Sequence, residues 1–157
     1  MGKTFLVAVD YSKNATRAVN FVADTFSTEH KIILLGVLPK PPAVCDMDAE
    51  SLAVPFLVEK RELCQMEYEN ELAIRKAVEN AKKTLMDAGF PEASIQEHLK
   101  QQQVGIARDI VSEAQRLKAD MIILGRRGLS GIKEFFLGSV SQKVLQLAKD
   151  KSVLLVQ

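Results

Sequence analysis

The sequence lacks the residues and segments that mark several specialised classes of protein. Its two cysteines, Cys45 and Cys64, are too few for a disulfide framework or a four-ligand zinc site, and we expect both to be reduced, inert thiols. Its two histidines, His30 and His98, are too few for a histidine-rich metal site. No apolar run approaches the ~20 residues that span a bilayer. The sequence therefore predicts no resident metal and no membrane-spanning segment.

Positive and negative side chains are also nearly balanced in number. The 157 residues include 21 Lys and Arg against 20 Asp and Glu, a net charge of +1 that gives no support to a DNA-binding face. The length predicts a single domain over residues 1–157. The amino-terminal residues have no signal-peptide layout, and Leu6 stands where a myristoylation signal needs Ser or Thr. We therefore expect a cytoplasmic protein with neither a nucleic-acid nor a membrane partner.

What the sequence does contain is a regular alternation of two apolar patterns. Five short segments are typical of strands, and four segments with apolar residues three or four positions apart are typical of helices. The expected strands span residues 5–9, 32–38, 94–102, 121–124 and 152–156. The expected helices span about residues 15–26, 58–88, 106–117 and 140–147. This alternation predicts an α/β fold with a mostly parallel sheet and right-handed crossovers.

Three details refine this pattern. Residues 94–102 are more polar than the other expected strands, which predicts a position at the edge of the sheet. The stretch from Pro39 to about Pro55 has weak periodicity, so we expect a long loop that is either mobile or functional. Either Ser12 or Asn14 can cap the first helix.

Ligands of open α/β sheets bind beyond the carboxyl ends of the strands. Asp10, Val37 and Gly125 lie at the ends of the first, second and fourth expected strands. Gly125 also opens the glycine-dense segment 125–139, where missing side chains let the backbone approach a ligand. Ser139 would begin the last helix, whose N–H groups and dipole favour a phosphate. Alternatively, these are ordinary loop glycines and Ser139 caps the helix.

The familiar motifs of nucleotide binding and catalysis are missing. The sequence has no G-x-x-x-x-G-K-[ST] phosphate-binding loop, and no G-x-G-x-x-G follows the first expected strand. Ser130 does not lie in a G-x-S-x-G nucleophile elbow, and both histidines fall outside the strand ends. We therefore predict no catalytic residues.

The glycine spacing nevertheless resembles that of a known family. Gly125, Gly128 and Gly138-Ser139 reproduce the G-2x-G-9x-G-[ST] signature of the universal stress protein family, in its ATP-binding subgroup. The segment from Val7 to Ser12 also looks like the family's first strand with its aspartate, and the resemblance extends end to end over a stand-alone, single-domain member. It implies a Rossmann-like, open parallel sheet of five strands in the order 3-2-1-4-5, with helices on both faces. The nucleotide would lie between the first and fourth strands.

The same resemblance implies an ATP site built from residues at several places in the chain. The backbone around Ala8 and the side chain of Asp10 would face the adenosine, and Val37 would contact the adenine. The ribose side would be lined by Leu124 and Gly125. The phosphates would be surrounded by Arg127, Gly128, Gly138, Ser139, Val140 and Ser141. Main-chain N–H groups, two hydroxyls and the charge of Arg127 would bind the anion, and the phosphates and water would hold Mg²⁺.

These expectations support a nucleotide-dependent regulatory protein of the stress response as the first hypothesis. The first alternative is a slow ATPase or phosphotransferase that uses the same pocket, although the pocket offers no clear general base. The second is a dimeric structural module without nucleotide. The last strand, 153–156, is apolar throughout and would lie at the sheet edge, so we expect a homodimer in which two such edges meet antiparallel, as the resemblance also implies.

Overall fold

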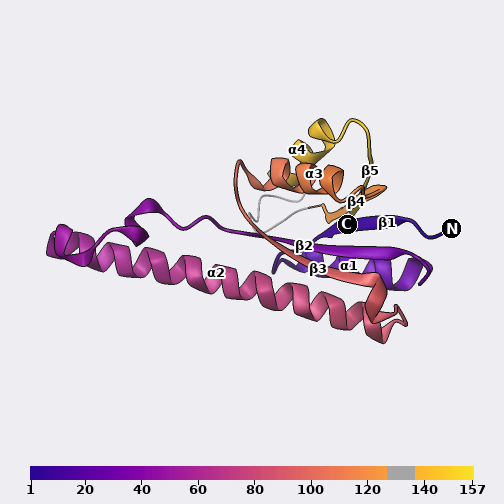
Figure 1. Cartoon of the computed structure of the whole chain (residues 1–157), viewed down its shortest axis with the longest axis horizontal. Helices are drawn as coiled ribbons and strands as arrows, with labels where there is room; N and C mark the ends of the chain where they lie inside the picture. The colour runs from indigo at the N-terminus through magenta and orange to yellow at the C-terminus, as the bar shows by residue number, and fades with distance from the viewer. Residues whose placement is uncertain (127–136) are drawn as a thin grey trace.

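The chain forms a parallel sheet flanked by helices, as the alternation of patterns predicted. The computed structural model describes residues 1–126 and 137–157 (Figure 1). The strands in these ranges are β1 (Thr4–Ala8), β2 (Lys31–Leu38), β3 (Ile95–Gln101), β4 (Met121–Gly125) and β5 (Ser152–Val156). The helices are α1 (Lys13–Thr25), α2 (Val54–Asp87), α3 (Ile106–Arg116) and α4 (Ser139–Leu147). Short 3₁₀ helices η1 (Ala43–Asp46), η2 (Ala49–Ser51) and η3 (Glu92–Ser94) lie before α2 and β3.

The strands pair in parallel in the order β3-β2-β1-β4-β5. This confirms the order that the family resemblance implies, and it places β3 at an edge, as its polarity predicted. The order reverses between β1 and β4, because the chain runs outward from β1 to β3 and then returns to the other side of β1. Such a reversal opens a crevice at the carboxyl ends of the two central strands.

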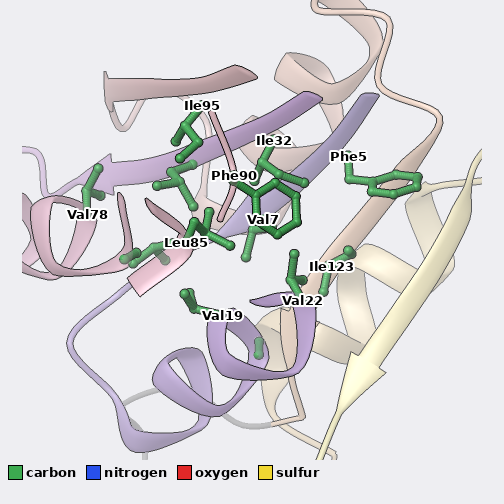
Figure 2. Close-up of a cluster of buried hydrophobic side chains, with 14 of the residues drawn as sticks. Phe5, Val7, Val19, Val22, Ile32, Val78, Leu85, Phe90, Ile95 and Ile123 are labelled. Atoms are coloured by element: carbon green, nitrogen blue, oxygen red, sulfur yellow. The ribbon is translucent and has the colours of Figure 1, made fainter. Parts of the chain in front are cut away.

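Helices cover both faces of this sheet. α1 and α2 lie on one face, and α3 and α4 lie on the other (Figure 1). Successive residues of β1 enter different cores, since Leu6 packs under α3 and α4 whereas Val7 packs with α1 and α2. Figure 2 shows the second of these cores, in which Val22 of α1 and Leu85 of α2 share a cluster with Val7. Because both faces are covered, the central strands are apolar throughout rather than at every second position.

The beginnings of the first two helices are set by local chemistry. The Oγ atom of Ser12 accepts the backbone N–H of Ala15 at 3.1 Å, so Ser12 is the cap of α1. α2 starts at Val54, before the predicted residue 58, because Pro55 falls in the first helical turn, where a missing N–H costs nothing. Although α2 is 34 residues long, neither it nor another helix in the described ranges combines the length and apolar character that a bilayer crossing requires.

The two cysteines form a disulfide bond, so the prediction of reduced thiols is wrong. Cys45 lies in η1 and Cys64 in α2, and their Cα atoms are 5.9 Å apart. The expected loop after β2 contains η1 and η2, and η1 contacts α2. The chain reverses between the two cysteines, which brings η1 beside the first half of α2 (Figure 1). The spacing of apolar residues does not indicate where the chain reverses, so it could not predict this disulfide.

Candidate functional site

A pocket opens at the carboxyl ends of β1, β2 and β4, where the strand order reverses. Its volume is about 290 Å³. Eight of the eleven predicted site residues line it, namely Ala8, Asp10, Val37, Leu124, Gly125, Ser139, Val140 and Ser141. The other lining residues are Val9, Ser12, Ala15, Leu35, Ile74, Ile106 and Ile110. The structure thus brings together, in one cavity, residues that are far apart in the sequence.

One part of the pocket lining is apolar and comes from several elements. Val37 of β2, Leu124 of β4 and Ile74 of α2 contribute to it, together with Ile106 and Ile110 of α3. The three isoleucines are not among the residues predicted from the sequence. Ile106 could have been predicted as a site residue, because a helix that follows a parallel strand starts at the edge of the sheet where ligands bind. Ile106 is an exposed apolar residue in that first turn. A flat apolar group, such as a purine base, suits this part of the lining.

The polar part of the lining is the beginning of α4. The first hydrogen bond within this helix runs from the N–H of Gln142 to the carbonyl of Gly138, at 2.9 Å. The N–H groups of Ser139, Val140 and Ser141 therefore have no hydrogen-bond acceptor within the helix. They carry the positive end of the helix dipole into the pocket that these three residues line. Such a group of amides binds phosphate or another anion.

Two of the predicted phosphate ligands are already engaged in the structure. The N–H of Gly138 donates to the carbonyl of Arg126 at 3.0 Å. The hydroxyl of buried Ser141 donates to the carbonyl of Gly125 at 2.9 Å, which ties the start of α4 to the end of β4. The one proton of that hydroxyl is used there, so α4 offers a ligand its amides and the hydroxyl of Ser139, not two hydroxyls.

Asp10 orders the turn at the end of β1 and also lies in the pocket lining. Its Oδ1 atom accepts the N–H of Ser12 at 2.8 Å, which forms the turn between β1 and α1. The residue also lines the pocket. A carboxylate has two oxygens and about four acceptor positions, so the turn leaves it able to accept a hydrogen bond from a ligand hydroxyl.

Gly125 is required by packing, whatever the ligand. A Cβ atom on this residue would lie 2.6 Å from the carbonyl carbon of Asn14 and 2.7 Å from its oxygen. The end of β4 therefore passes directly against the backbone of the first turn of α1. This contact holds the strand end, and with it the floor of the pocket, close to the cap of α1.

The predictions for Arg127 and Gly128 fall outside the described residues. Among the residues that the structure describes, no group of three or more His, Cys, Asp or Glu side chains is arranged to hold a metal ion. Within the described part of the lining, Asp10 is the one carboxylate. A divalent cation at this site would therefore take most of its ligands from the phosphates of a nucleotide and from water, as hard cations commonly do.

Comparison with known proteins identifies the family. The profile of the Universal stress protein family matches residues 1–157. The chain belongs to this family. Universal stress protein MJ0577 of Methanocaldococcus jannaschii is 32% identical over 162 residues, which cover 100% of this chain and 96% of MJ0577. A universal stress protein of Thermus aquaticus is 32% identical over 145 residues, with 92% of each chain covered.

Solved structures of universal stress proteins share the fold. The structure of MJ0577 superposes with a TM-score of 0.69 at 29% identity, covering 99% of this chain and 96% of that one. A universal stress protein crystallised in complex with cAMP superposes with a TM-score of 0.65 at 26% identity, covering 99% of this chain and 97% of that one. The predicted family and fold class are thereby confirmed.

Proposed function

We propose that this universal stress protein binds ATP with Mg²⁺ in the pocket at the end of β1 and β4. The observation that carries the proposal is the start of α4, whose amides line a pocket that is otherwise largely apolar. The phosphates would contact the N–H groups of Ser139 to Ser141. The adenine would lie against Val37 and Ile106, and Asp10 would accept a hydrogen bond from the adenosine. The relative that binds cAMP supports an adenine nucleotide as the ligand class.

Binding would serve regulation in the stress response rather than turnover. The described part of the pocket lining holds donors and one carboxylate, and that carboxylate already orders the β1–α1 turn. A nucleotide acts as a signal when a partner has different affinities for the bound and free forms of the protein. We further propose a cytoplasmic location, as the sequence predicted. A disulfide in that compartment is generally a redox-responsive one rather than a permanent staple.

Calorimetry with protein stripped of co-purified nucleotide tests ATP binding. We expect ATP with Mg²⁺ to bind with a dissociation constant in the micromolar range, about −8 kcal/mol. Adenosine and tripolyphosphate, titrated separately, should each bind more weakly, because each occupies only one part of the pocket. A titration without heat at millimolar ATP would contradict the proposal. Equal affinities for ATP and AMP would support an adenine nucleotide as the ligand, but they would contradict recognition of the triphosphate.

We also propose that two copies pair through β5. This strand is hydrogen-bonded to β4 on one side and forms the edge of the sheet on the other. Val153, Leu154 and Leu155 are only half-buried in the single chain. An apolar edge of this kind is stabilised when a second strand covers it. Sedimentation velocity at tens of micromolar should show a dimer, and a monomer at that concentration would refute the pairing.

A further inference from the structure

Residues 43–72 form a projection from the body of the protein. It consists of η1, η2 and the first half of α2, which runs well past the sheet (Figure 1). The buried residues of α2 are Ile74, Val78, Ala81 and Leu85, all in its second half. The first half therefore does not belong to either core of the domain.

This projection carries an apolar groove on its surface. Phe56, Leu63 and Met66 follow one another at spacings of seven and three, which places them on one face of α2. Phe56 is 59% exposed and Met66 is 60% exposed. Together with Val44 and Leu52, these residues line a hollow of about 350 Å³ between the η1–η2 segment and the helix. In the second half of α2, by contrast, the apolar residues that follow one another at spacings of three or four are buried.

The projection is also strongly acidic. Residues 43–72 contain eight Asp and Glu against two Lys and Arg, a net charge of −6, so the rest of the chain carries +7 to reach the total of +1. Two of these acidic residues, Glu59 and Glu62, line the groove itself. Lys60, which also lines it, donates its Nζ proton to the carbonyl of Met47. The groove thus presents apolar side chains with carboxylates beside them.

The disulfide joins the two walls of the groove. Cys45 is adjacent in sequence to Val44 on one wall, and Cys64 is adjacent to Leu63 on the other. The bond therefore fixes the η1 segment against α2 at the place where the hollow lies. Reduction would leave the segment held by non-covalent contacts alone, and the walls could then separate.

We propose that this groove binds a basic amphipathic helix of a partner protein. The apolar face of such a helix would cover Phe56, Leu63 and Met66, and its Lys and Arg residues would meet Glu59 and Glu62. Methionine adapts to varied apolar surfaces, which suits a docking groove. Charge favours this occupant over a second projection, because two surfaces of net charge −6 repel each other. This site is separate from the proposed nucleotide pocket.

A synthetic peptide of about 18 residues, five helical turns of Leu and Lys in amphipathic order, is a suitable probe. We expect fluorescence anisotropy to show micromolar binding that weakens as salt is added. The same peptide with Glu in place of Lys should not bind. Prior reduction of the protein should weaken binding several-fold. Equal binding of the Lys and Glu peptides would overturn the proposal.

Two variants of α2 separate apolar docking from simple attraction between opposite charges. Met66→Glu should weaken binding of the Lys peptide at least tenfold, because it puts a carboxylate on the apolar floor. Met86→Glu is the matched control, since Met86 is a 41%-exposed residue of the same helix outside the projection. Nonspecific attraction predicts that both variants bind slightly more tightly than wild type, which would refute the groove.

Two further measurements complete the test. If wild type sediments as a larger species than Met66→Glu in the absence of peptide, a second copy is the occupant and the proposal is wrong. ATP titration of Met66→Glu should match that of wild type, because Met66 does not line the nucleotide pocket. The experiments therefore distinguish a failure of peptide binding at the groove from a failure of ATP binding at the pocket.

Discussion

Replacing Ser139 with glutamate is expected to weaken ATP binding on the order of 100-fold, about 2.7 kcal/mol. Ser139 is the first residue of α4 and is exposed at the mouth of the pocket. A carboxylate there would accept the N–H groups that are proposed to bind the phosphates, and it would repel their charge. The same carboxylate complements the dipole at the start of the helix, which stabilises the fold by roughly 0.3–1 kcal/mol. Binding and stability should therefore change in opposite directions.

The matched control is Ser152→Glu. Ser152 is the exposed first residue of β5, paired in register with Met121, so it lies at the amino ends of the strands, away from the pocket. Calorimetry with ATP and thermal unfolding should be measured on both variants. Equal ATP affinities for Ser139→Glu and Ser152→Glu would show that the start of α4 does not bind the phosphates. A lower melting temperature for Ser139→Glu would indicate that ATP binding is weaker because the fold is damaged.

The sequence predicted the architecture well because burial in a parallel sheet leaves a direct mark on composition. β2 is buried at seven successive positions, so its apolar run is uninterrupted. β3 is covered less completely, and its polarity indicated an edge strand. The start of α2 was placed too late for the opposite reason. Its first half lies outside the core, and no core-facing stripe marks it.

The candidate site was predictable where it depends on the backbone at strand ends. Asp10, Val37 and Gly125 follow from topology alone, since the carboxyl ends of the strands meet at one edge. Ile74 and Ile110 did not follow, because they reach the pocket from helix faces whose apolar spacing is the same as that of ordinary core residues. The disulfide depends on a chain reversal that neither cysteine signals.

The hydrogen-bond partner of the Ser141 hydroxyl could not be predicted from the sequence. From the sequence, a serine in the first turn of a helix is a candidate ligand for phosphate. The structure instead places its hydroxyl on the carbonyl of Gly125. The sequence shows which side chains can donate a hydrogen bond, but the fold decides which acceptor each donor reaches.

A buried carboxylate on α3 is expected to control the stability of the fold in acid. The Glu113 side chain is 5% exposed and joins α3 to β3. Its Oε2 atom accepts from Arg116 at 2.6 Å and lies 2.8 Å from Nε2 of His98, and its Oε1 atom accepts from Lys100 at 2.7 Å. The hydrogen bond from Arg116 contributes most to lowering the pKa of Glu113 to about 2, with burial opposing it and Lys100 and His98 adding to it.

The direction of the pH effect follows from this pKa. The folded value of about 2 lies below the ordinary 4.5. The ionised form therefore stabilises the fold above about pH 4.5, and this contribution disappears as the pH falls toward 2. Its size is at most about 3 kcal/mol, and less in salt because Arg116 is largely exposed. Wild type should lose this stability between about pH 4.5 and pH 2, in addition to what its other carboxylates contribute.

Glu113→Gln should lower the free energy of unfolding at pH 7 by about 3 kcal/mol, because it leaves partly buried cations without their carboxylate. It should also flatten the acid dependence of stability. Glu92→Gln is the control, since Glu92 pairs with Lys82 at 2.9 Å but has a 67%-exposed side chain, and exposed pairs contribute little. Urea unfolding at pH 7 and pH 3 measures both effects. If Glu113→Gln and wild type lose stability in parallel on acidification, the cluster does not hold α3 to β3, and acid acts through other carboxylates.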